Sequence, residues 1–92
     1  MAWKIHISSP TASDAILKLG QDKMALLAEK DRTEVEGRQI SAGASCMLNL
    51  LQSVPEGHEV TGWMEGRYGP RYQMGEEQIG HFGCHLTSRQ RA

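Results

Sequence analysis

The chain has 92 residues with ten Lys and Arg against eleven Asp and Glu, so its formal net charge is −1, and 39% of its residues are hydrophobic. This composition is that of a globular domain with a modest core, and it excludes an intrinsically disordered chain. The near-neutral charge argues against a protein that coats DNA nonspecifically, which would carry a basic excess. We expect residues 1–92 to form a single small domain.

The cysteine content and the N-terminus bear on the compartment. Cys46 and Cys84 are the only cysteines, fewer than a small secreted domain normally carries, so a reducing compartment is expected. The first residues lack the apolar core of a signal peptide, and no apolar run approaches the length of a membrane span. We therefore expect a soluble, cytoplasmic protein that does not act at a membrane.

Residues 2–7 predict a strand. Trp3, Ile5 and Ile7 alternate with polar residues, which is the pattern of a half-buried strand. Pro10 ends this segment, because proline cannot donate to a strand ladder.

A helix is predicted to follow the first strand. Thr11 or Ser13 can cap its N-terminus, and an apolar stripe continues to about Lys30. Gly20 lies within the stripe, where glycine costs about 1 kcal/mol relative to alanine. We interpret Gly20 as a point where a strand packs closely against the helix; a break in the helix is the alternative.

Residues 31–39 are polar and charged, with Val35 as the one clear apolar residue, and they predict a loop or a short edge strand. Ser41 can then cap a second helix, which residues 55–57 would end. Small residues at positions 42–44 would let this helix pack tightly on a sheet. Its buried side is expected to carry Cys46, Met47, Leu50, Leu51 and Val54.

The last third of the chain predicts an antiparallel meander of short strands punctuated by glycines. In residues 58–66, Val60, Gly62 and Met64 share one face and Trp63 lies on the other. Two further strands are expected, over residues 71–75 and 78–87. Residues 87–92 are expected to form a mobile tail.

Together these elements predict an α+β domain with the order β-α-α-β-β-β. Two helices would pack on one face of a three- or four-stranded antiparallel sheet and leave the other face to solvent. Trp63, His81 and His85 are expected on the solvent face.

His81, Cys84 and His85 are residue types that bind zinc, and Cys46 or His58 could complete a set of four ligands. In a strand, however, the two histidines lie on one face and Cys84 on the other, which prevents all three from binding one ion. We expect Cys84 to be a small core residue and the histidines to be surface residues. No metal and no cofactor is predicted.

The sequence shows no catalytic motif. Cys46 lies on the apolar side of a predicted helix, where a thiol is inert, and nothing groups the glutamates into a pocket. Residues 75–80 have the glycine spacing of a phosphate-binding loop but lack the Lys-Ser/Thr that should follow. We expect a protein that is not an enzyme and has no small-molecule substrate.

The strongest binding candidate is the segment at positions 66–72, where two Arg–Tyr pairs surround a Gly-Pro turn. Arg, Tyr and Trp are enriched where proteins bind partners, and arginine pairs well with carboxylates and phosphates. The alternative is that Tyr72 and Trp63 pack in the core while the arginines are only solvated. The candidate partner-binding residues are Lys30, Arg32, Trp63, Arg67, Tyr68, Arg71, Tyr72, Arg89 and Arg91.

In its length, its helix pair and its C-terminal strands at positions 60–86, the chain resembles the small phage-encoded anti-CRISPR proteins that act on type I-F systems. The resemblance implies an inhibitor that occupies the guide-RNA surveillance complex in the host bacterial cytoplasm. It also implies contacts with Cas subunits, and with guide-RNA phosphates through arginines, that block hybridisation with target DNA. The chain lacks the acidic cluster of DNA-mimicking inhibitors. The alternative is a small RNA- or DNA-binding or regulatory module of phage or bacterial origin.

Overall fold

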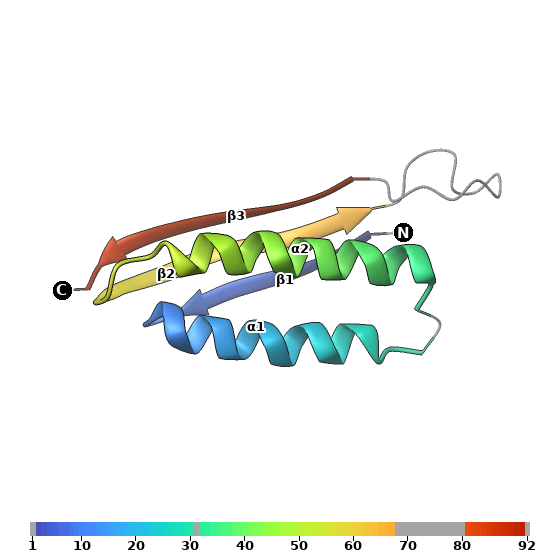
Figure 1. The fold of residues 1–92 in the computed structure, drawn as a ribbon, viewed down its shortest axis with the longest axis horizontal. Helices are drawn as coiled ribbons and strands as arrows, with labels where there is room; N and C mark the ends of the chain where they lie inside the picture. Colours follow the sequence, from blue (N-terminus) through green and yellow to red (C-terminus); the bar gives the residue numbers. More distant parts are fainter. Residues whose placement is uncertain (1, 31, 68–80, 92) are drawn as a thin grey trace.

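The computed structural model describes residues 2–30, 32–67 and 81–91. In chain order they form β1 (Ala2–Ser9), α1 (Ala12–Leu27), α2 (Glu34–Gln52), β2 (His58–Arg67) and β3 (His81–Gln90). The strands make one antiparallel sheet in the order β1-β2-β3, and both helices lie on the same face of it (Figure 1). The predicted α+β class and layer arrangement are confirmed. The strand expected over residues 71–75 lies outside the described residues.

The core lies between the helices and the inner face of the sheet. Trp3, Ile5 and Ile7 of β1 are buried there, as their alternation with polar residues predicted. Val60 and Met64 of β2 point the same way and are fully buried. The helices contribute the remaining apolar residues of this cluster, Ala15, Leu19, Ile40, Ala44, Met47 and Leu51.

Helix α1 is capped by Thr11, one of the two caps that the sequence allowed. The backbone N–H of Asp14 donates to Thr11 Oγ1 (3.1 Å), which satisfies one of the unpaired amides at the helix start. Both interpretations of Gly20 are wrong: the helix continues through it, and a side chain added there would meet nothing within 4 Å. Gly20 therefore lies on the open surface of α1.

Helix α2 begins at Glu34, with Thr33 as its cap, and not after Ser41. The prediction of a loop or edge strand over residues 31–39 is therefore wrong for residues 34–39, whereas residues 32 and 33 do lie in the connection between the helices. Polar residues in this part are compatible with a helix because they form ion pairs. Glu34 contacts Arg38 one turn along α2 (3.2 Å), and Glu36 contacts Arg32, which precedes the helix (2.5 Å).

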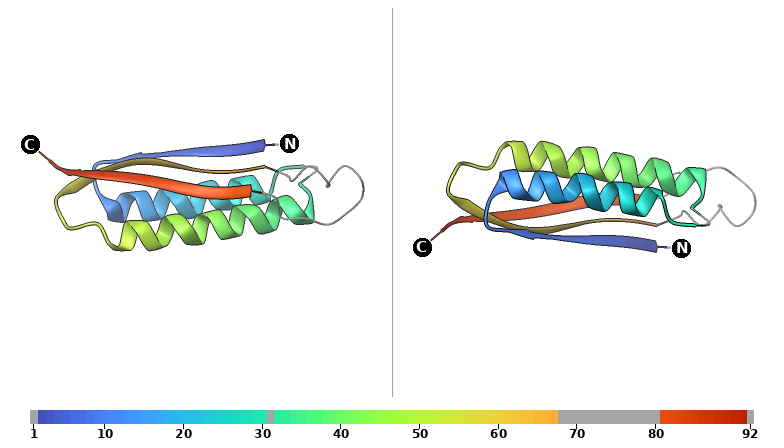
Figure 2. Two further views of the ribbon diagram at one scale, coloured as in Figure 1. Left: turned by 90° about the horizontal axis from the view of Figure 1, so that it is seen from above. Right: turned by 90° about the horizontal axis from the view of Figure 1, so that it is seen from below.

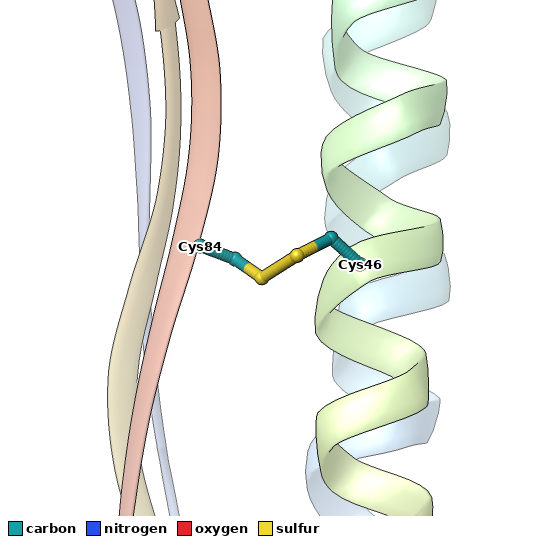
Figure 3. Close-up of a disulfide and its surroundings, with 2 residues drawn as sticks. All are labelled: Cys46 and Cys84. Atoms are coloured by element: carbon teal, nitrogen blue, oxygen red, sulfur yellow. A yellow bond between two sulfur atoms is a disulfide. The ribbon is translucent and has the colours of Figure 1, made fainter.

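A disulfide between Cys46 and Cys84 joins α2 to β3 (Figure 3). The Cα atoms of the pair are 6.3 Å apart, within the range that a disulfide spans. The prediction of an inert thiol at Cys46 is wrong, because Cys46 is bonded to Cys84, which packs against the core as expected. The inference of a reducing compartment from the number of cysteines loses its basis, because disulfides persist mainly in oxidising environments. None of the described helices combines the length and the apolar composition that a membrane crossing requires.

The C-terminal residues continue β3. Residues 87–90 pair with β2, where Gln90 lies opposite His58, and the backbone N–H of Arg91 donates to the carbonyl oxygen of Gly57 (3.0 Å). The expected tail from residue 87 is therefore wrong as far as Arg91. Gly57 has a positive φ of 82°, which glycine adopts without strain at the turn into β2.

Candidate partner-binding face

The sheet face opposite the helices, which we call the outer face, is not covered by either described helix (Figure 2). Alternate residues of each strand build it, because successive side chains of a strand point to opposite faces. Its described side chains are Lys4, His6 and Ser8 of β1, Glu59, Thr61, Trp63, Glu65 and Arg67 of β2, and His85, Thr87 and Arg89 of β3. Gly83 of β3, opposite Glu65, also lies on this face but contributes no side chain.

Trp63 lies at the middle of the outer face. The strand register places His6 on one side of it and His85 on the other. The rings of Trp63 and His85 have centroids 4.6 Å apart, and Lys4 Nζ lies 5.0 Å from the centroid of the indole. These contacts leave Trp63 half-buried. The expected placement of Trp63 and His85 on the solvent face is confirmed, and the alternative with Trp63 in the core is wrong.

Arginines lie at both ends of this face. Arg67 is exposed at the end of β2, beside a surface hollow that Lys4, Glu65 and Phe82 help to line. Near the other end, Arg89 forms an ion pair with Glu59 across β2 and β3. Arg67 and Arg89 are about 26 Å apart along the strands, at roughly 3.3 Å per residue. The cations are thus distributed along the face, with the indole between them.

Buried contacts fix the backbone that carries Arg67. Trp3 Nε1 donates to Gln39 Oε1 (3.1 Å), and Gln39 Nε2 donates to the carbonyl oxygen of Arg67 (2.8 Å). Gln39 is fully buried, so its amide connects α2 to the ends of β1 and β2 without contact with solvent. This support holds the end of β2 in place while the guanidinium of Arg67 faces solvent.

The structure does not bring all the predicted site residues together. Trp63, Arg67 and Arg89 share the outer face. Arg32 lies in the connection between α1 and α2, where it pairs with Glu29 and Glu36 and donates to the carbonyl oxygen of Leu26 (2.8 Å).

The other predicted site residues lie elsewhere. Lys30 is exposed in the same helix connection, at the end of the molecule where β2 finishes (Figure 1). Arg91 is exposed just beyond β3. Tyr68, Arg71 and Tyr72 lie outside the described residues.

Sequence reasoning missed Lys4 and His6 as members of this face. The alternation of β1 showed that both point away from the core, but only the pairing of β1 with β2 places them beside Trp63. A search for polar residues on the solvent side of each predicted strand would have found them.

The outer face can bind planar and anionic groups. An indole beside a cation can stack on a planar group, and exposed arginines can pair with carboxylates or phosphates. Among residues 2–30, 32–67 and 81–91, no three His, Cys, Asp or Glu side chains gather in a way that could hold a metal ion. No family model, curated protein or solved structure matches the chain.

Proposed function

We propose that this chain is a non-enzymatic binding protein whose outer face occupies the guide-RNA surveillance complex of a type I-F CRISPR system. The observation that supports a binding role is Trp63, a half-buried indole at the centre of an uncovered sheet face, in contact with Lys4 and His85. Central aromatic residues with arginine nearby are the usual composition of a binding hot spot. The choice of partner rests on the resemblance to small anti-CRISPR proteins.

The proposed mechanism is occupancy of a groove in the surveillance complex. Trp63 fills a pocket on a Cas subunit, and Arg67 pairs with an acidic side chain or a guide-RNA phosphate beside it. A standard interface buries about 800 Å² on each partner, which a small domain can supply from one face. The bound chain then blocks hybridisation with target DNA sterically, without chemistry.

A double variant, Trp63→Ala with Arg67→Glu, tests this proposal. Calorimetry with a purified type I-F surveillance complex should show binding about 30-fold or more weaker, because truncating one hot-spot residue costs about 2 kcal/mol or more. The control is Leu17→Ala with Lys18→Glu on the exposed surface of α1, which reverses the same charge and also truncates an exposed apolar side chain, and it should bind normally. Unchanged binding of the Trp63/Arg67 variant, or no binding of the unmodified chain, contradicts the proposal.

The second candidate is a module that binds free RNA or DNA, and Trp63 favours it too, because stacking on an indole tolerates any base. Fluorescence anisotropy with a short single-stranded RNA of mixed sequence separates the two candidates. Binding that weakens with added salt and disappears in the double variant supports the nucleic-acid module. Binding to the surveillance complex without binding to the free RNA supports the inhibitor.

A further inference from the structure

Within the residues that the structure describes, strand β3 has one open edge. Among the described residues its only neighbouring strand is β2. The backbone N–H of Arg91 donates to the carbonyl oxygen of Gly57. Because hydrogen-bonded pairs alternate along an antiparallel ladder, the odd-numbered residues of β3 have their backbone groups directed toward β2. The backbone groups of Phe82, Cys84, Leu86 and Ser88 therefore point to the open edge. A long edge strand without Pro or Lys is a template for pairing with another strand.

Apolar side chains lie beside this edge. Helix α2 and strand β3 run in the same direction (Figure 1), and the disulfide aligns Cys46 with Cys84. Leu50 follows Cys46 by one helical turn and Leu86 follows Cys84 by two strand residues, each a shift of about 6 Å along the molecule. Leu50, which is 40% exposed, therefore lies at the level of the half-buried Leu86.

We propose that two copies of this chain associate through β3, as antiparallel neighbours related by a two-fold axis at Leu86. Leu86 then lies opposite Leu86 of the partner subunit, and Cys84 lies opposite Ser88 of the partner subunit. The open backbone groups of both strands pair in this register. Leu50 and Leu86 of both copies meet at the axis, so the exposed apolar surface beside each edge becomes buried.

Charge complementarity supports the same register. Arg89 lies opposite Gly83 of the partner subunit, where no side chain projects and a Cβ would meet nothing within 4 Å. Glu65 is the β2 neighbour of Gly83 within each chain. The guanidinium of Arg89, whose Nε pairs with Glu59 of its own chain, can direct its outer nitrogens toward Glu65 of the partner subunit. The symmetry makes this contact twice.

The disulfide holds β3 in place before a second copy binds. It attaches the strand to α2, so the edge is in place before a second copy arrives and less ordering is needed on binding. The two-fold axis runs perpendicular to the sheet, so both outer faces lie on the same side of the dimer. The dimer does not depend on the proposed inhibitor function, and it would present two Trp63 side chains on one continuous surface.

Sedimentation velocity of the oxidised chain across the micromolar range tests the dimer. The unmodified chain should sediment with twice the mass of one chain. Leu50→Lys should weaken self-association about tenfold or more, because it puts a charge at the apolar axis. Leu17→Lys is the matched control, since Leu17 is 66% exposed on α1, far from β3, and this variant should remain a dimer. A monomeric unmodified chain, or a Leu50→Lys variant that dimerises as tightly as the unmodified chain, overturns the proposal.

Amide hydrogen exchange identifies the edge that is used. In the dimer the amides of Cys84, Leu86 and Ser88 should be protected, and in the Leu50→Lys monomer they should exchange rapidly. The amides of His85 and Thr87, which bond to β2, should stay protected in both proteins and show that the fold survives. Rapid exchange at Leu86 in a dimeric sample would place the interface elsewhere and overturn the proposal. A monomer that adds a strand only from a foreign peptide would also overturn it.

Discussion

At the residue scale, Trp3 of β1 contacts both β2 and α2. Its indole N–H is bonded to Gln39, and its ring lies against two glycines. A Cβ at Gly66, the residue opposite Trp3 in β2, would approach the indole nitrogen to 2.6 Å, and a Cβ at Gly43 of α2 would approach the ring to 3.0 Å. The ring thus occupies space that only glycine leaves free.

Two glycine substitutions should change stability in opposite directions. Gly66→Ala should lower the free energy of unfolding by about 1–3 kcal/mol, because the indole of Trp3 must move. Gly20→Ala should raise it by about 0.5–1 kcal/mol, because Gly20 is exposed within α1 and alanine has the better helix propensity. Urea unfolding of both variants measures the difference. Full stability of Gly66→Ala would show that Trp3 does not pack against this position.

At the element scale, the disulfide links α2 to β3, two elements that are far apart in sequence but in contact in the fold. Cys46 and Cys84 are separated by 38 positions. The cross-link attaches β3 to α2, whereas β3 is otherwise held by hydrogen bonds to β2 and by the packing of Leu86. The disulfide is therefore the covalent link that holds β3 against α2.

Removal of the disulfide should destabilise the fold. The chain-entropy model gives a loss of about 4 kcal/mol for a closed loop of this size. Urea unfolding with and without a reductant measures it, and Cys46→Ala with Cys84→Ala should reproduce the reduced value. The double alanine variant should not respond to the reductant, which is the control. Equal stability of the oxidised and reduced chains would contradict the prediction.

At the scale of the whole molecule, the helices cover one sheet face only, so the two tryptophans lie in different environments. Trp3 is 7% exposed in the core, whereas Trp63 lies on the outer face with Lys4 and His85. The core therefore lies on one side of the sheet, and the proposed binding residue Trp63 lies on the other side.

Acrylamide quenching of fluorescence checks this arrangement. In the unmodified chain a large part of the emission should be quenched, because Trp63 is accessible. In Trp63→Phe only Trp3 remains, and quenching should fall several-fold, because the core excludes the quencher. Circular dichroism should show the same fold for both proteins. Equal quenching of the two would mean that Trp63 is as shielded as Trp3.

Much of the fold could be predicted because it depends on local periodicity. The alternation in β1 and β2 identified their buried faces correctly, and it placed Trp63 on the outer face. The Thr11 cap marked the start of α1. These features are properties of neighbouring residues, since the period of a helix or a strand appears directly in the order of side chains.

Only the tertiary structure decided the features that depend on residues far apart in sequence. Gln39 is buried because α2 packs on the sheet and its amide bonds to β1 and β2, although its sequence position predicted a loop. Residues 87–90 are a strand because β2 supplies their hydrogen-bond partners. The disulfide forms because β3 lies beside α2. The sequence by itself determined which face of each strand is apolar. The packing of the helices and strands decided which polar residues lie around Trp63 and which arginines form ion pairs with glutamates of the same chain.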